Sequence, residues 1–92
     1  MILWRVTDGE RMITDYIRAN NMDEAGGIFK EKHNRSAVEF QPTDEKIQAV
    51  YFTDAPSYPA FFKGTKTEAR KSGNLYIRQW QLNAQIDRIE TI

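Results

Sequence analysis

The feature that most constrains the fold of this chain is an alternating run that ends in a tight-turn signal. Ile2, Trp4 and Val6 fall on one face at the spacing of a β-strand. Asp8-Gly9 follows at once, and this dipeptide favours a hairpin because glycine tolerates a positive φ. The pattern predicts an opening β-hairpin whose return strand lies within residues 12–19.

Residues 10–20 also admit a helical interpretation. Thr7 and Glu10 have the spacing of a capping box, and several apolar side chains fit one helical face. These side chains are Met12, Ile13, Tyr16 and Ile17. We favour the hairpin and keep a helix as the alternative for this segment.

A helix is predicted over residues 21–33. Asn21 can cap its start, and Asp23 and Glu24 suit the positive end of a helix dipole. Gly26-Gly27 opposes this prediction, because two interior glycines cost roughly 2 kcal/mol relative to alanine. The same pair would allow the helix to approach an underlying sheet closely.

Three later segments read as strands or as a terminal turn. Ser36–Gln41 and Ile47–Thr53 are predicted strands, the second near the centre of a sheet. Asn74–Leu82 alternates most clearly, with Tyr76, Arg78 and Trp80 on one strand face. Beyond it, isoleucines recur every third residue up to the last one, residue 92, which predicts a helical turn packed on the sheet.

Residues 54–73 form a long segment without a clear strand, and the sequence leaves open whether they are ordered. The segment holds two prolines and two glycines, and connections of this length are usually functional or mobile. A short helix over residues 67–71, stopped by Gly73, is expected within it.

Together these elements predict one α+β domain over residues 1–92. We expect a small antiparallel sheet of four or five strands, formed by the opening hairpin, then a helix, then further strands, with one main helix packed on one face. We find no internal repeat in the sequence. No apolar run is long enough to cross a bilayer, so no membrane role is expected and the predicted location is cytoplasmic.

Composition argues against several kinds of chemistry. The 13 basic and 13 acidic side chains cancel, so the net charge does not favour nucleic acid or a membrane surface. The chain has no cysteine, which excludes disulfides and thiolate chemistry. His33 is the single histidine, and we interpret it as a surface or packing residue. Catalytic residues, metal ligands and a cofactor are therefore not predicted, and an enzyme is the less favoured class.

The strongest functional signal lies between residues 58 and 80, where basic and aromatic side chains interleave. The first group is predicted to contact a partner: Tyr58, Phe61, Phe62, Lys63, Lys66, Arg70 and Lys71. A second group, Tyr76, Arg78 and Trp80, would extend it toward nucleic acid, because cations bind phosphates and aromatic rings stack on bases. The structural alternative is that the rings fill the core and the cations form a solvated helix face.

Short words of the sequence resemble strands of ADP-ribosyltransferase-like domains. These words are Val50-Tyr51-Phe52-Thr53-Asp54 with Ala55-Pro56-Ser57-Tyr58, Gly73-Asn74-Leu75-Tyr76, and Leu3-Trp4-Arg5-Val6-Thr7. The resemblance implies NAD as substrate and implies site residues at Arg5, at Tyr51 or Thr53, and at Glu90. It makes a minimal enzyme of that kind one alternative function.

The leading hypothesis is a small non-enzymatic binding protein that acts as an inhibitor, adaptor or regulator through protein–protein contact. Its size and lack of motifs favour an accessory protein of a phage or mobile element. Nucleic-acid binding through residues 58–80 is the second hypothesis. The predicted strand Ser36–Gln41 could also pair with a second copy at a sheet edge, which would make a homodimer.

Overall fold

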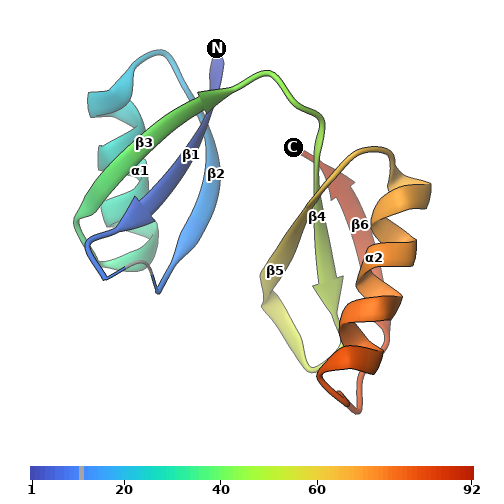
Figure 1. Cartoon of the computed structure of the whole chain (residues 1–92). Helices are drawn as coiled ribbons and strands as arrows, with labels where there is room; N and C mark the ends of the chain where they lie inside the picture. The colour runs from blue at the N-terminus through green and yellow to red at the C-terminus, as the bar shows by residue number, and fades with distance from the viewer. Residues whose placement is uncertain (11) are drawn as a thin grey trace. The chain divides into compact units, whose positions relative to one another are not determined.

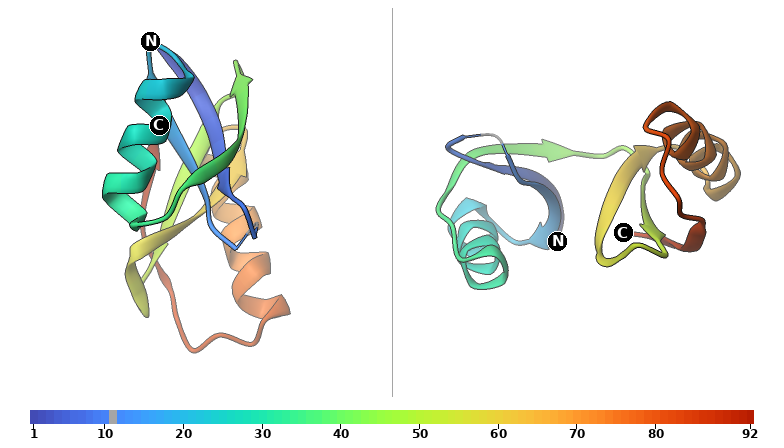
Figure 2. Two further views of the ribbon diagram at one scale, coloured as in Figure 1. Left: turned by 90° about the vertical axis from the view of Figure 1, so that its left-hand side faces the viewer. Right: turned by 90° about the horizontal axis from the view of Figure 1, so that it is seen from below.

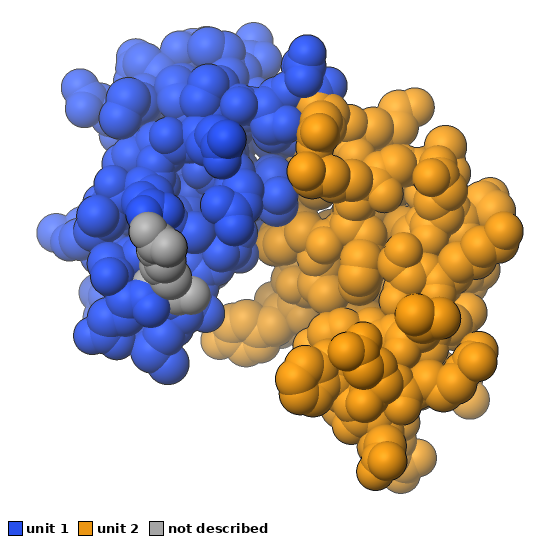
Figure 3. Space-filling model, in the orientation of Figure 1, with its two compact units in different colours: residues 1–44 blue, residues 45–92 orange. Residues whose placement is uncertain are grey.

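The computed structural model describes residues 1–10 and 12–92 and divides into two compact units. Unit 1 is Met1–Asp44 and unit 2 is Glu45–Ile92 (Figure 3). Each unit has its own three-stranded antiparallel sheet and its own helix (Figure 1). The α+β class is therefore confirmed, whereas a single sheet of four or five strands with one main helix is wrong.

Unit 1 begins with the predicted hairpin, and its first strand is the central one. The strand order is β2-β1-β3, with both outer strands antiparallel to β1. Asp8 stabilises the turn, because its carboxylate accepts a hydrogen bond from the backbone N–H of Met12 at 2.9 Å. The elements of unit 1 are β1 (Ile2–Asp8), β2 (Thr14–Ala19), α1 (Met22–His33) and β3 (Ala37–Thr43).

The core of unit 1 lies between the sheet and α1, which covers one sheet face (Figure 2). Trp4 and Val6 project into it from β1, as their alternation predicts, and Phe29 is fully buried on α1. The indole N–H of Trp4 donates to the carbonyl of Ala19 at 3.2 Å, so the one polar atom of this ring is satisfied.

The predicted start of α1 is confirmed in atomic detail. The side chain of Asn21 accepts a hydrogen bond from the backbone N–H of Glu24 at 2.9 Å, which satisfies a free donor of the first turn. A Cβ on Gly26 would lie 3.2 Å from the ring of Phe40, so this glycine does allow close approach to the sheet. A Cβ added at Gly27 would have nothing within 4 Å, so close approach to the sheet does not explain this glycine.

Unit 2 repeats the order of elements found in unit 1. Its strand order is β5-β4-β6, again with the first strand at the centre and both neighbours antiparallel. α2 packs on one face of this sheet, and Val50, Phe52 and Ala69 are buried between them. The elements of unit 2 are β4 (Ile47–Phe52), β5 (Ala55–Lys63), α2 (Lys66–Gln79) and β6 (Ile86–Thr91).

Several predictions for the second half of the chain are wrong. The long segment over residues 54–73 consists of β5 and the first half of α2. Residues 74–82 are not a strand, because α2 continues through Gly73 to Gln79. Gly73 is buried inside the helix, where an added Cβ would lie 3.0 Å from Ile86 and 3.3 Å from Val50. It lets α2 approach the sheet rather than stopping it.

The tail forms the strand β6 rather than a helical turn, and its isoleucine spacing has a simple cause. Ile86 pairs with Phe52 and Ile89 pairs with Val50, and the register shifts opposite Tyr51 and Phe52 because Asp87 of β6 has no partner on β4. A bulge of this kind lets two side chains three residues apart face the same core. The three-residue spacing of Ile86 and Ile89 therefore reflects a bulged strand and not a helix.

The repeat extends to equivalent residues 44 positions apart. Asn21 and Thr65 cap their helices, and each accepts the backbone N–H of a glutamate three residues later. Ala25 and Ala69 then follow in the first turn, and both are fully buried. The fold is thus built from two ββαβ units with matching helix starts, although the sequence shows no obvious repeat.

Candidate functional site

An aromatic cluster in unit 2 extends from the core to the surface at the end of α2. Phe52 is buried, and its ring stacks on Tyr76 with 5.6 Å between the ring centroids. Tyr76 in turn contacts Trp80, whose ring centroid is 6.3 Å away. Trp80 is 62% exposed, which is unusual for the largest apolar side chain and marks this position as a candidate contact.

The backbone at Trp80 is held by a Schellman motif. Gln81 adopts the left-handed conformation with φ 52°. The backbone N–H of Leu82 donates to the carbonyl of Ile77 at 2.9 Å, and that of Gln81 donates to the carbonyl of Arg78 at 3.3 Å. The backbone that carries Trp80 is therefore held in one conformation, so covering the ring would cost mainly side-chain entropy.

Exposed cations flank a further apolar side chain on α2. Leu75 is 60% exposed and lies between Lys71 and Arg78 on the outer stripe of the helix, at spacings of four and three residues. We define the α2 surface as Lys66, Arg70, Lys71, Leu75, Tyr76, Arg78 and Trp80.

Glu68 is the single acidic residue of α2, and it serves the helix cap. The backbone N–H of Thr65 donates to the Glu68 carboxylate at 3.1 Å, while the Thr65 hydroxyl accepts from the Glu68 N–H at 3.2 Å. The first of these bonds is the main reason that the pKa of Glu68 is lowered, with Lys71 adding a smaller effect. The cations of the α2 surface thus greatly outnumber its acids.

The structure places the remaining predicted contact residues on β5, and they do not form one surface. Tyr58 is 73% exposed, whereas Phe62 packs into the core and meets the edge of Tyr76. Phe61 is half-buried and pairs with Ala49 in the sheet. Lys63 forms an ion pair with Glu45 at 2.9 Å. Of the predicted set, the α2 residues come together on one helix.

Tyr76, Arg78 and Trp80 do not share a strand face as predicted. They lie on the last turn of α2, where Tyr76 and Trp80 are one helical turn apart and Arg78 points elsewhere around the axis. Leu75 was missed by sequence reasoning. Its flanking cations at helical spacing would have identified it if the segment had been assigned as a helix.

Unit 1 serves as an internal comparison for this surface. Counting from the two helix caps, the positions of Leu75 and Tyr76 correspond to Glu31 and Lys32 on α1. Unit 1 therefore builds the same topology with charged side chains there. Tyr76 packs on Phe52 and Phe62 of its own unit, whereas the exposed Leu75 is not a requirement of the ββαβ topology.

Charge is also distributed unequally between the units. Residues 1–44 carry six basic and eight acidic side chains, which gives a net charge of −2. Residues 45–92 carry seven basic and five acidic side chains, which gives +2. The neutral total conceals this asymmetry.

The buried acids of unit 1 have structural partners. Asp15 is paired with His33 at 2.9 Å and with Lys32 at 3.0 Å, and the His33 ring also contacts Phe29. Asp8 holds the hairpin turn and also forms an ion pair with Arg35, which follows α1. Among the described residues, no group of three or more potential metal ligands occurs.

The residues implied by the transferase-like resemblance fall in different units. Arg5 lies on β1, whereas Tyr51 and Glu90 lie on β4 and β6. The guanidinium of Arg88 sits 3.8 Å from the centre of the Tyr51 ring and pairs with Glu90 at 3.0 Å. Because Glu90 and Tyr51 both engage Arg88, they form a local surface network.

Comparisons with known proteins found no matching family model, no matching curated protein and no matching solved structure. Among the described residues, no helix has the length and apolar character needed to cross a bilayer.

Proposed function

We propose that this protein is a small binding protein that contacts an acidic partner protein through the α2 surface. The observation that carries the proposal is the exposure of Trp80 at the end of an aromatic cluster anchored in the core. Tryptophan in a fixed position is the side chain most enriched among energetically dominant interface contacts. Leu75 supplies a second apolar contact on the same helix.

The charge of the α2 surface supports an acidic partner. Lys66, Arg70, Lys71 and Arg78 are all exposed, and the carboxylate of Glu68 already accepts hydrogen bonds in the helix cap. Lys71 and Arg78 flank the exposed Leu75, which matches the usual interface layout, in which an apolar contact is bordered by polar side chains. Complementary charge also speeds association and selects against basic partners.

Nucleic acid is the alternative that the same residues allow. Stacking on bases needs open ring faces, and one face of Tyr76 is already stacked on Phe52. Trp80 alone then offers a largely exposed ring on this helix. This geometry favours a protein contact over a single-stranded nucleic acid.

The test is a pull-down of the tagged protein from lysate of its native host, with and without nuclease, read by mass spectrometry. We expect one protein of low isoelectric point to be retained near equal stoichiometry in both samples. Trp80→Ala should abolish its retention, with an affinity loss of at least about tenfold, which corresponds to about 1.4 kcal/mol.

Met12→Ala is the matched control, because Met12 is 72% exposed and lies in unit 1. It should leave retention unchanged. Loss of the retained protein after nuclease treatment would mean that the α2 surface binds nucleic acid instead of a protein. Equal retention by wild type and Trp80→Ala would remove this surface as the contact.

A further inference from the structure

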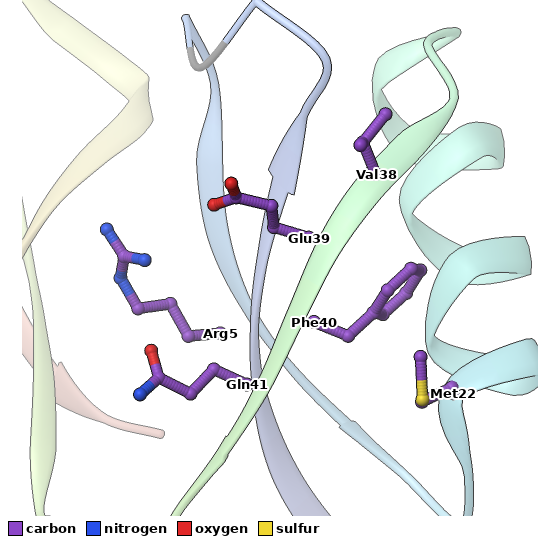
Figure 4. A pocket seen from close by; sticks show the side chains of 6 residues that line it. All are labelled: Arg5, Met22, Val38, Glu39, Phe40 and Gln41. Atoms are coloured by element: carbon purple, nitrogen blue, oxygen red, sulfur yellow. The ribbon is translucent and has the colours of Figure 1, made fainter.

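A candidate ligand site lies in unit 1 around Arg5, on the central strand β1. A hollow of about 460 Å³ is lined by Arg5, Met22 and the four residues 38–41 of β3. Figure 4 shows that Arg5, Glu39 and Gln41 point to one side of the sheet, whereas Met22 lies on the side of α1. We call the polar side of this cavity the Arg5 hollow and define it by Arg5, Glu39 and Gln41.

The pairing of β1 with β3 brings these three side chains together. Arg5 lies directly opposite Gln41, and Thr7 lies opposite Glu39. Residues opposite each other in an antiparallel pair have their Cβ atoms about 4.5–5.5 Å apart, and residues two positions apart on one strand share a face. A single small group can therefore contact the Arg5 guanidinium and the Gln41 amide at the same time.

Arg5 differs from the other half-buried basic side chains of unit 1 because it has no partner. Arg35 pairs with Asp8 at 3.0 Å, and His33 pairs with Asp15 at 2.9 Å. Within the part of the chain that the structure describes, no hydrogen bond or ion pair involves the Arg5 side chain. A guanidinium that has lost part of its hydration without gaining an acceptor costs free energy, so an anion that supplied the acceptor would be stabilised here.

The charge of the hollow selects the kind of anion. Glu39 is the one acid among the lining residues, and its carboxylate accepts a hydrogen bond from the Thr7 hydroxyl at 3.3 Å. Arg5 and Glu39 together carry no net charge, so the single guanidinium does not offset the hydration that a phosphate dianion would lose. A singly charged carboxylate loses less hydration, and the guanidinium can donate to both of its oxygens.

We infer that the Arg5 hollow binds the carboxylate of a small organic acid. The guanidinium of Arg5 donates to both carboxylate oxygens, and the amide of Gln41 donates to one of them from the opposed position on β3. The volume of about 460 Å³ lies within the range of small-molecule sites. The hollow belongs to unit 1 and the α2 surface to unit 2, so this inference does not depend on the proposed function.

The test is an NMR titration of the nitrogen-labelled protein with sodium acetate, with sodium chloride at the same ionic strength as the reference. We expect the Arg5 Nε–H signal and the backbone amides of residues 39–41 to shift saturably with acetate alone. The dissociation constant should be on the order of 1–10 mM, because so small a ligand makes few contacts. Inorganic phosphate at about pH 8, where it is mainly a dianion, should bind more weakly than acetate.

Three arginine variants locate the binding. Arg5→Gln should abolish the saturable shifts of residues 39–41. Arg5→Lys keeps the charge but loses the two parallel hydrogen bonds, and it should weaken acetate binding about tenfold. Arg18→Gln is the matched control, because Arg18 lies opposite Leu3 on the neighbouring strand β2 and its loss removes the same charge from the same sheet. It should leave acetate binding unchanged.

Glu39→Gln tests the effect of charge on the choice of anion. It removes the negative charge beside the ligand and keeps an acceptor for the Thr7 hydroxyl. Acetate should bind about threefold more tightly, which is the effect of one unit charge roughly 7 Å away in water, and phosphate should gain more because it carries twice the charge. Weaker acetate binding by this variant would contradict a carboxylate bound next to Glu39.

Absence of a saturable shift with acetate would overturn the inference, and so would equal binding by wild type and Arg5→Gln. Loss of binding in Arg18→Gln would overturn it as well, since the shifts would then report the charge of the sheet and not a site. Tighter binding of phosphate than of acetate by wild type would remove a carboxylate as the ligand. The proposed function is tested separately, because Arg5→Gln should still retain the partner protein and Trp80→Ala should still bind acetate.

Discussion

At the scale of single residues, the start of α2 depends on one carboxylate with a lowered pKa. The backbone N–H of Thr65 donates to Glu68, and this bond favours the ionised form. A group whose pKa is lower in the folded state stabilises the fold above its unfolded pKa, here about 4.5. That stabilisation is lost as the pH falls through the lowered, folded pKa.

Glu68→Gln should therefore be less stable than wild type at pH 7 and should match it in acid, because glutamine keeps an acceptor but has no charge to lose. Urea unfolding of both proteins at pH 7 and at about pH 3 measures the two differences. Glu31→Gln, an exposed glutamate outside any described cap, should show no such closing gap. A difference between wild type and Glu68→Gln that persists or widens in acid would contradict the assignment.

At the scale of elements, identical sequence signals had different outcomes because of what followed them. Thr7 and Glu10 have capping-box spacing, but Gly9 and the alternating run made a hairpin there. Thr65 and Glu68 have the same spacing and do start a helix. Unit 1 was largely predictable because its periodicities agree with its turn signals.

Unit 2 was less predictable because its elements depend on contacts distant in sequence. Residues 74–82 alternate like a strand, yet small buried side chains at Ala69 and Gly73 allow a helix to pack on the sheet. The bulge at Asp87 that explains the isoleucine spacing of β6 is visible only once the strands are paired. For the same reason the α2 surface could be located in the sequence, but the fact that its residues lie on one helix could not be predicted.

Gly27 and Gly73 are both interior helix residues, but they lead to opposite predictions. Gly27→Ala should raise the free energy of unfolding by about 1 kcal/mol, because the added Cβ meets nothing and alanine favours a helix. Gly73→Ala should lower it by about 1 kcal/mol, because the contact with the fully buried Val50 outweighs the helical preference. Chemical denaturation measures both. Stabilisation by Gly73→Ala would show that α2 does not approach the sheet as closely as described.

At the scale of the whole molecule, a neutral chain is divided into a unit of charge −2 and a unit of charge +2. Net charge alone would have predicted little electrostatic steering. The α2 surface carries part of the positive charge of unit 2 on the helix that also holds Leu75 and ends at Trp80. The α2 surface is therefore basic, although the isoelectric point of the whole protein is near neutral.

Partner binding should accordingly weaken with salt, by about tenfold between roughly 0.05 M and 0.5 M, because the Debye length shortens from over 10 Å to a few ångströms. Binding should persist at high salt through the apolar contact of Trp80. In Lys66→Gln/Arg70→Gln/Lys71→Gln the salt dependence should largely disappear while this residual affinity remains. A titration of affinity against salt separates the alternatives, since binding to phosphates would fall by several orders of magnitude and leave almost no residual affinity. Salt-independent binding by wild type would instead mean that the cations of α2 do not face the partner.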